Sequence, residues 1–112
     1  MQRKDEGAVA VSDATFGQTV LSAPRPVLVD FGAEWCGPCV AVAPVIAKLA
    51  LEYADRLTVA TVDVDAEPQL AARYGVRSLP TVLLLTGGEV RRVLVGARSG
   101  QEYRTAIDEV LH

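Results

Sequence analysis

Residues 27–39 read VLVDFGAEWCGPC, a continuous apolar run broken by one acid and followed by two cysteines with two residues between them. An apolar run of this kind is typical of a strand covered on both faces in the middle of an α/β sheet. Beyond the cysteines, apolar residues recur at helical spacing from Val42 to Tyr53, which predicts a helix over residues 36–53. The pattern therefore predicts a buried strand that leads into a helix, with the cysteine pair between them.

The rest of the chain reads as alternating strands and helices. We expect strands at residues 9–11, 57–64, 81–86 and 90–95, and helices at residues 12–21, 67–75 and 99–111. The helix between the strands at 27–31 and 57–64 makes that pair a right-handed parallel βαβ unit. Gly87-Gly88 supplies the positive φ angles of a tight hairpin between the last two strands. This order predicts a mixed central sheet with helices on both faces.

Size and composition suit one ordinary globular domain. The chain has 112 residues, of which 50% are hydrophobic and 22% charged, so we expect a single domain at residues 8–112 after a flexible N-terminal tail at residues 1–7. The net charge of -3 gives no reason to expect a nucleic-acid partner or a membrane surface. We see neither an apolar stretch of about 20 residues nor a secretory signal, so a cytoplasmic location is the simplest expectation.

The two cysteines, Cys36 and Cys39, indicate metal or redox chemistry rather than a structural staple, because the loop they close is very short. The single histidine is His112, so the chain offers no second pair of zinc ligands, although half of a zinc site shared between two chains stays an alternative. Cys36 lies where a helix N-terminus favours the thiolate. Cys39, one turn further in, is expected to be less exposed and to resolve a mixed disulfide.

Seven segments spread over the chain resemble the thioredoxin family. They lie at residues 29–31, 33–39, 43–44, 62–65, 74–81, 87–90 and 95–97. The resemblance runs from about Val9 to Leu111 and implies the thioredoxin fold, a mixed five-stranded sheet flanked by four helices. It also implies a thiol–disulfide oxidoreductase that reduces disulfides in client proteins. Gly37-Pro38 between the cysteines is the dipeptide typical of reducing members of the family.

In the reaction cycle that the resemblance implies, Cys36 attacks a partner disulfide and Cys39 releases the partner as a dithiol. A thioredoxin reductase, which is an NADPH-dependent flavoprotein, then restores the dithiol. The domain itself is expected to bind neither a cofactor nor a metal and to act as a monomer. A redox-independent binding subunit or holdase is the alternative, and a disulfide isomerase or oxidase is a third possibility that Gly37-Pro38 disfavours.

The resemblance also assigns the remaining site residues. Asp30 corresponds to an acid beneath the second cysteine that exchanges protons with it, although a plain charge at a strand end is the other interpretation. The Leu79–Pro80 bond is expected to be cis, against the ordinary preference for trans. The surface that docks substrates and shapes the site is expected to comprise Trp35, Gly37, Pro38, Val76, Leu79, Pro80, Gly96 and Ala97.

Three positions depart from the family pattern. Gly32 replaces an aromatic residue, which predicts a less packed and more mobile active-site loop. Val40 stands where a lysine is common, so the site should be less positive. Thr61 stands where many members carry a lysine near the buried acid, so Asp30 lacks its countercharge and its pKa should be raised.

Overall fold

The computed structural model describes residues 7–112. Apart from Gly7, the tail expected at residues 1–7 lies outside the described residues. The elements in chain order are β1 (Ala8–Ala10), α1 (Asp13–Phe16), η1 (Gly17–Leu21), β2 (Val27–Gly32), α2 (Gly37–Glu52), β3 (Thr58–Asp63), α3 (Pro68–Arg73), β4 (Thr81–Thr86), β5 (Glu89–Val95) and α4 (Gly100–Leu111). Every strand and helix expected from the sequence is present, and the first helix finishes as the π-helical turn η1.

The five strands form one mixed sheet in the order β1-β3-β2-β4-β5. β3 runs parallel to both β1 and β2, whereas β4 is antiparallel to β2 and to β5. The hairpin between β4 and β5 turns at Gly87 and Gly88, whose φ angles of 57° and 81° confirm the expected glycine turn. β2 therefore lies at the centre of the sheet.

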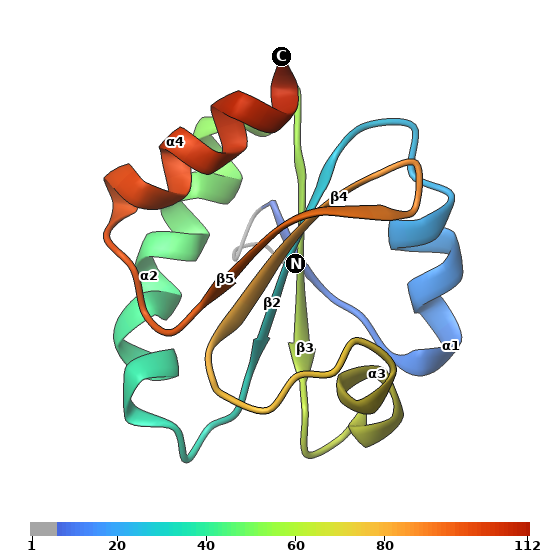
Figure 1. Cartoon of the computed structure of the whole chain (residues 1–112), viewed down its shortest axis with the longest axis vertical. Helices are drawn as coiled ribbons and strands as arrows, with labels where there is room; N and C mark the ends of the chain where they lie inside the picture. The colour runs from blue at the N-terminus through green and yellow to red at the C-terminus, as the bar shows by residue number, and fades with distance from the viewer. Residues whose placement is uncertain (1–6) are drawn as a thin grey trace.

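Helices cover both faces of this sheet, α2 and α4 on one side and α1 and α3 on the other (Figure 1). Alternate residues of β2 point to opposite faces and both faces are covered, which is why the strand is apolar apart from Asp30. Leu28 packs in the core beneath α2 and α4, while Val29 and Phe31 pack in the core beneath α1 and α3. Asp30 shares the side of Leu28, so the one acid of this strand faces the layer that contains α2.

The first residues of three helices are fixed by capping serines and by a proline. Ser12 caps α1 and Ser99 caps α4, each in a reciprocal capping box, with Thr15 and Glu102 respectively as partners. Pro68 opens α3 from its first turn, where a missing N–H costs no helical hydrogen bond. These local signals explain why the predicted boundaries lie within a few residues of those in the structure.

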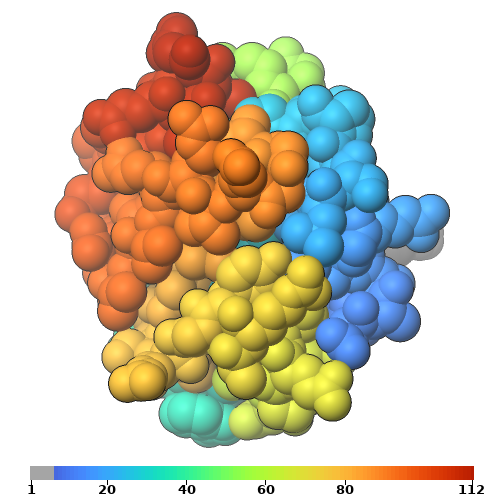
Figure 2. Space-filling model, turned by 45° about the vertical axis from the view of Figure 1, so that its right-hand side comes forward, coloured from blue at the N-terminus to red at the C-terminus, as the bar shows by residue number. Residues whose placement is uncertain are grey.

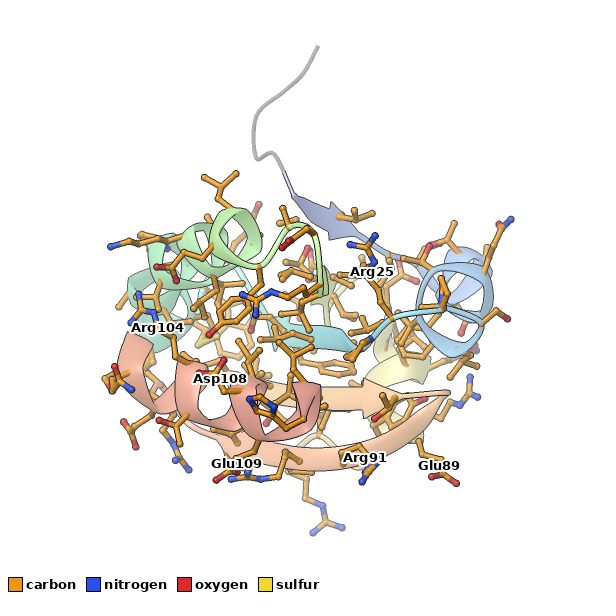
Figure 3. The ribbon with its side chains drawn as sticks, turned by 90° about the horizontal axis from the view of Figure 1, so that it is seen from above. Arg25, Glu89, Arg91, Arg104, Asp108 and Glu109 are labelled. Atoms are coloured by element: carbon orange, nitrogen blue, oxygen red, sulfur yellow. A yellow bond between two sulfur atoms is a disulfide. The ribbon has the colours of Figure 1, made fainter. Side chains whose placement is uncertain are left out.

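Polar side chains tie α4 to its neighbours at the end of the molecule where α2 finishes. The guanidinium of Arg104 donates to both carboxylate oxygens of Glu52, at 3.0 and 3.3 Å. The hydroxyl of Tyr53, just after α2, donates to Asp108 at 2.8 Å. Arg92 of β5 pairs with Glu109. Figure 3 views the molecule from above, with Arg104, Asp108 and Glu109 along α4.

Candidate active site

Cys36 is the residue that caps the N-terminus of α2. Its backbone is extended, with φ -90° and ψ 107°, and its Sγ accepts a hydrogen bond from the Cys39 N–H at 3.2 Å. Gly37 and Pro38 complete the first turn, where proline is tolerated because those N–H groups have no intrahelical acceptor. This turn holds the two cysteines with their Cα atoms 5.2 Å apart, joined as a disulfide.

The expectation that Cys39 is less exposed than Cys36 is wrong. Cys36 is 6% exposed and Cys39 is 8% exposed. Both cysteines are buried to a similar degree. Gly32 of β2 lies against Cys39, since a Cβ atom placed there would stand 3.4 Å from both Cβ and Sγ of Cys39, and as a glycine it adds no side chain over the inner cysteine.

The two oxygens of the Asp30 carboxyl group are not equally accessible to solvent. The residue is half-buried, but its Oδ1 is fully buried and has no hydrogen-bond partner among residues 7–112. Thr61 is its neighbour on β3 and Val82 its neighbour on β4, and neither carries a charge. Burial raises the pKa of Asp30 from an ordinary 3.8 to about 6, which confirms the direction predicted from Thr61. The group can therefore exchange a proton near neutral pH.

A hollow of about 260 Å³ connects Asp30 and Cys39. Gly32, Val40 and Thr61, the three positions that depart from the family pattern, all line it. The hollow lies beside the inner cysteine, and the looser packing and greater mobility expected of this loop both stay predictions.

Trp35 is 70% exposed, and its indole N–H donates to Asp65 Oδ2 at 2.7 Å. Asp65 is itself held by a hydrogen bond from its N–H to Asp63 Oδ1 at 2.9 Å. The sequence analysis missed that Asp65 positions Trp35. The only signal for this role was the pair of acids Asp63 and Asp65, one at the end of β3 and one just after it. In Figure 2, the teal atoms near the start of α2 form the lower edge of the view, next to the yellow segment that includes α3.

The structure brings two of the other predicted site residues together. The Leu79–Pro80 bond is cis, as predicted, and the carbonyl of Pro80 accepts a hydrogen bond from the Gly96 N–H at 2.8 Å. Val76 and Leu79 are half-buried and line a second, shallow hollow beside α3. Gly37, Pro38 and Ala97 are exposed. The indole N–H of Trp35 bonds to none of these residues, so their action as one docking surface stays a prediction.

Residues 7–112 contain no group of three or more histidine, cysteine, aspartate or glutamate side chains arranged to hold a metal ion. Nor do they contain a helix with the length and apolar character needed to cross a bilayer.

Known proteins are similar to this chain over most of its length. The family model described as Thioredoxin matches residues 7–109. A protein named Thioredoxin 1 from Synechococcus elongatus is 49% identical over 90 residues, which cover 80% of this chain and 84% of that protein. The protein named Thioredoxin from Acidithiobacillus ferridurans is 45% identical over 101 residues, covering 90% of this chain and 94% of the relative.

A third relative is a fusion protein. The protein named Bifunctional thioredoxin reductase/thioredoxin from Mycobacterium leprae is 49% identical to this chain over 90 residues. The match covers 80% of this chain but 20% of that much longer protein.

Proposed function

The chain belongs to the thioredoxin family and is a thiol–disulfide oxidoreductase with disulfide reductase activity, and we propose that Cys36 is its attacking thiol and Cys39 its resolving thiol. The observation that carries this assignment is the hydrogen bond from the Cys39 N–H to Cys36 Sγ. A sulfur that accepts a backbone N–H at the positive end of a helix is stabilised as a thiolate.

The first step joins the two proteins. The Cys36 thiolate attacks one sulfur of a disulfide in a client protein, and that disulfide bond breaks. The other client sulfur leaves as a thiolate and takes a proton from water. Cys36 and the client are then linked by a mixed disulfide.

The second step releases the client. Cys39 passes its proton to the carboxylate of Asp30, and its sulfur attacks Cys36 Sγ. The mixed disulfide breaks, and the client leaves with its second sulfur reduced. The client has gained two electrons, and the chain ends as the Cys36–Cys39 disulfide seen in this structure. Support for Asp30 as the acceptor is its pKa of about 6 and its place with Cys39 in one hollow.

Client binding is assigned to the surface around the cysteines. Trp35 offers an exposed ring whose orientation is set by Asp65, and the exposed residues Gly37 and Pro38 carry no long side chain that would obstruct the approach to Cys36. We assign the remaining docking contacts to Val76, Leu79, Pro80, Gly96 and Ala97.

The oxidised chain must be reduced again, and we assign that step to a thioredoxin reductase, an NADPH-dependent flavoprotein. The Mycobacterium leprae relative supports this pairing because its name joins a thioredoxin reductase to a thioredoxin. The chain itself holds no cofactor in this scheme. It acts as a monomer in the cytoplasm, where such reductants keep thiols reduced.

Single-turnover reduction of insulin by the pre-reduced chain tests the assignment. Wild-type protein should reduce insulin, and both Cys36→Ser and Cys39→Ser should fail to complete the cycle. Mass spectrometry should find the client trapped on Cys36 in the Cys39→Ser variant. A client trapped on Cys39 in the Cys36→Ser variant instead would reverse the two roles. No reduction by wild-type protein would favour the redox-independent binding subunit, which the cysteine pair now disfavours.

A further inference from the structure

β5 is the last strand of the sheet, and part of its surface is uncovered. Among the described elements it pairs with β4 alone. Three of its valines are exposed, Val90 by 41%, Val93 by 55% and Val95 by 49%. In Figure 2 the orange atoms of the β4–β5 hairpin lie at the surface with no other segment over them. The strand therefore presents an apolar strip to solvent.

The three valines share one face of the sheet, the face of α1 and α3. Val90 stands opposite Leu85 and Val93 opposite Leu83, and directly opposite residues of two strands point to the same side. Val95, two residues beyond Val93, points the same way. Leu83 and Leu85 belong to the core beneath α1 and α3, so these helices cover β4 but leave β5 open.

The backbone of β5 is also open at two of these valines. The Gly96 N–H donates to the Pro80 carbonyl, and in an antiparallel pair such bonded positions alternate with positions whose N–H and C=O point away from the partner strand. Val93 and Val95 occupy the outward positions, and the Val95 carbonyl accepts the Arg98 Nε–H at 3.2 Å. The N–H and C=O of Val93 and the N–H of Val95 are left for a further strand.

A bulge limits how much of this edge can pair. The register passes from Leu84 opposite Arg92 to Leu85 opposite Val90, so Arg91 is an extra residue. Bulges bend an edge strand and interrupt its pairing. An added strand is therefore confined to the half of β5 nearest its C-terminal end.

That half lies close to the cysteines. Phe31 of β2 stands opposite Thr81 of β4, and Thr81 stands opposite Val95. The residue after Phe31 is Gly32, which lies against Cys39. Neighbouring strands are about 4.8 Å apart, so Val95 is about 10 Å from the strand that ends at the cysteines. A segment on β5 is within reach of a client cysteine through two or three residues.

The other face of β5 carries a positive charge. Arg92 stands opposite Leu84, which belongs to the core beneath α2 and α4. Arg92 pairs with Glu109, but a guanidinium has five N–H donors and one carboxylate uses at most two of them. An acidic side chain opposite Arg92 is therefore attracted, and a lysine is repelled.

We propose that β5 binds, as an additional strand, the extended segment that follows the cysteine of a client protein, and prefers segments in which apolar and acidic residues alternate. The segment leads away from the cysteines whereas β5 runs toward them, so the two are antiparallel. Its apolar residues lie beside Val93 and Val95, and its acidic residues face Arg92. The inference rests on the proposed function and names a class of client for it.

The kinetic test uses three peptides, each with its cysteine in a mixed disulfide with nitrothiobenzoate. One ends at Cys-Gly-Gly, a second continues with Val-Glu-Val-Glu, and a third continues with Val-Lys-Val-Lys. Attack by Cys36 of the reduced chain releases nitrothiobenzoate, which is followed by absorbance. The rate constant of the acidic peptide should exceed that of the truncated peptide about tenfold, and the lysine peptide should gain less. Equal constants for the acidic and truncated peptides, or a lysine peptide as fast as the acidic one, would overturn the proposal.

Variants of β5 locate the effect. Val93→Asp should bring the acidic peptide down to the truncated one, whose own rate should not change. Val93→Pro removes only an outward N–H, which an edge strand tolerates, and keeps the test available if the aspartate variant does not fold. Val9→Asp is the matched control, because Val9 is 45% exposed on β1, the opposite edge of the sheet. Arg92→Gln should narrow the gap between the acidic and lysine peptides. A tenfold preference that survives both Val93 variants contradicts the proposal.

A binding measurement separates this proposal from the proposed function. The acidic peptide with serine in place of cysteine cannot react, and it is titrated into the isotope-labelled oxidised chain. The amide NMR signals of Val93 and Val95 should shift and that of Val9 should not, even if the chain reduces no disulfide. Unshifted Val93 and Val95 signals would overturn the inference. So would a dimer in sedimentation that Val93→Asp dissociates, because a second copy would then cover this face.

Discussion

The two ends of α2 are held in opposite ways. At its C-terminal end, Glu52 accepts two hydrogen bonds from Arg104, and Tyr53 donates to Asp108. At its N-terminal end, the Asp30 Oδ1 that lies under this helix layer has no hydrogen-bond partner among residues 7–112, and Asp30 lines the hollow beside Cys39. One end joins helices through satisfied polar groups, and the other leaves a buried acid unsatisfied beside a disulfide.

The contrast shows where stability is given up for chemistry. A buried polar atom without a hydrogen bond destabilises a fold by about 1–3 kcal/mol. The site end of α2 therefore contributes less to the stability of the folded chain than the far end does. The bonds at the far end involve neither cysteine. Substitutions at the two ends should therefore have opposite consequences for stability and for reactivity.

The largest expected effect on stability is at the site end. Folded Asp30 has a pKa of about 6 against an ordinary 3.8, so between these pH values the unfolded chain ionises while the folded chain keeps its proton. Wild-type stability from this group is complete below pH 3.8, falls as pH rises to about 6, and then stays constant. At about 1.4 kcal/mol for each pH unit, the loss reaches up to about 3 kcal/mol.

Asp30→Asn should remove this loss and be the more stable protein at neutral pH. Urea denaturation of both oxidised proteins across the range would measure the difference, with the exposed Asp55→Asn as the matched carboxylate control. Parallel curves for wild type and Asp30→Asn would mean that Asp30 is solvated and that the two ends of α2 do not differ as described.

The same substitution should harm the reaction. Without a proton acceptor for Cys39, release of the mixed disulfide should slow by about 100-fold, the lower end of the range for a lost general base. The first attack by Cys36 should change much less. Stopped-flow mixing with a disulfide substrate resolves the two steps, and equal slowing of both would place Asp30 outside the second step.

A smaller effect is expected where the site end does have a hydrogen bond between residues far apart in the sequence. Asp65→Ala removes the acceptor of the Trp35 indole, which should let the ring turn away from its present position. Loss of this charged hydrogen bond should lower kcat/KM for a protein disulfide by about tenfold, mainly through KM. Reduction of hydroxyethyl disulfide should not follow, because this small substrate needs no contact with the Trp35 ring. A parallel fall in both rates would show general damage instead.

The smallest expected effect is at the far end. Tyr53→Phe deletes the donor to Asp108 and should lower the free energy of unfolding by about 1 kcal/mol without changing redox kinetics. Tyr74→Phe is the control, since the Tyr74 ring packs against Phe16 and Phe31 and its hydroxyl has no hydrogen-bond partner among the described residues. A change in insulin reduction by Tyr53→Phe would show that the two ends are coupled.

Much of this molecule follows from short stretches of its sequence. The apolar run before the cysteines encodes a strand buried on both faces, and Ser12, Ser99 and the Gly87-Gly88 pair encode helix starts and a hairpin. These signals act within a few residues, because helix caps and tight turns involve neighbours along the chain. The cysteine spacing at a helix start likewise identifies the reactive pair without knowledge of the rest of the fold.

Only the tertiary structure decided which distant groups meet. The Trp35–Asp65 bond spans 30 residues, the Arg104–Glu52 pair 52 and the Tyr53–Asp108 bond 55. No local pattern predicts such partners, because they depend on how separate elements lie against one another. The exposure of Cys39 is the same kind of property: it was mispredicted from the position of Cys39 in the helix, because it depends on which residues of other elements, such as Gly32 of β2, pack against it.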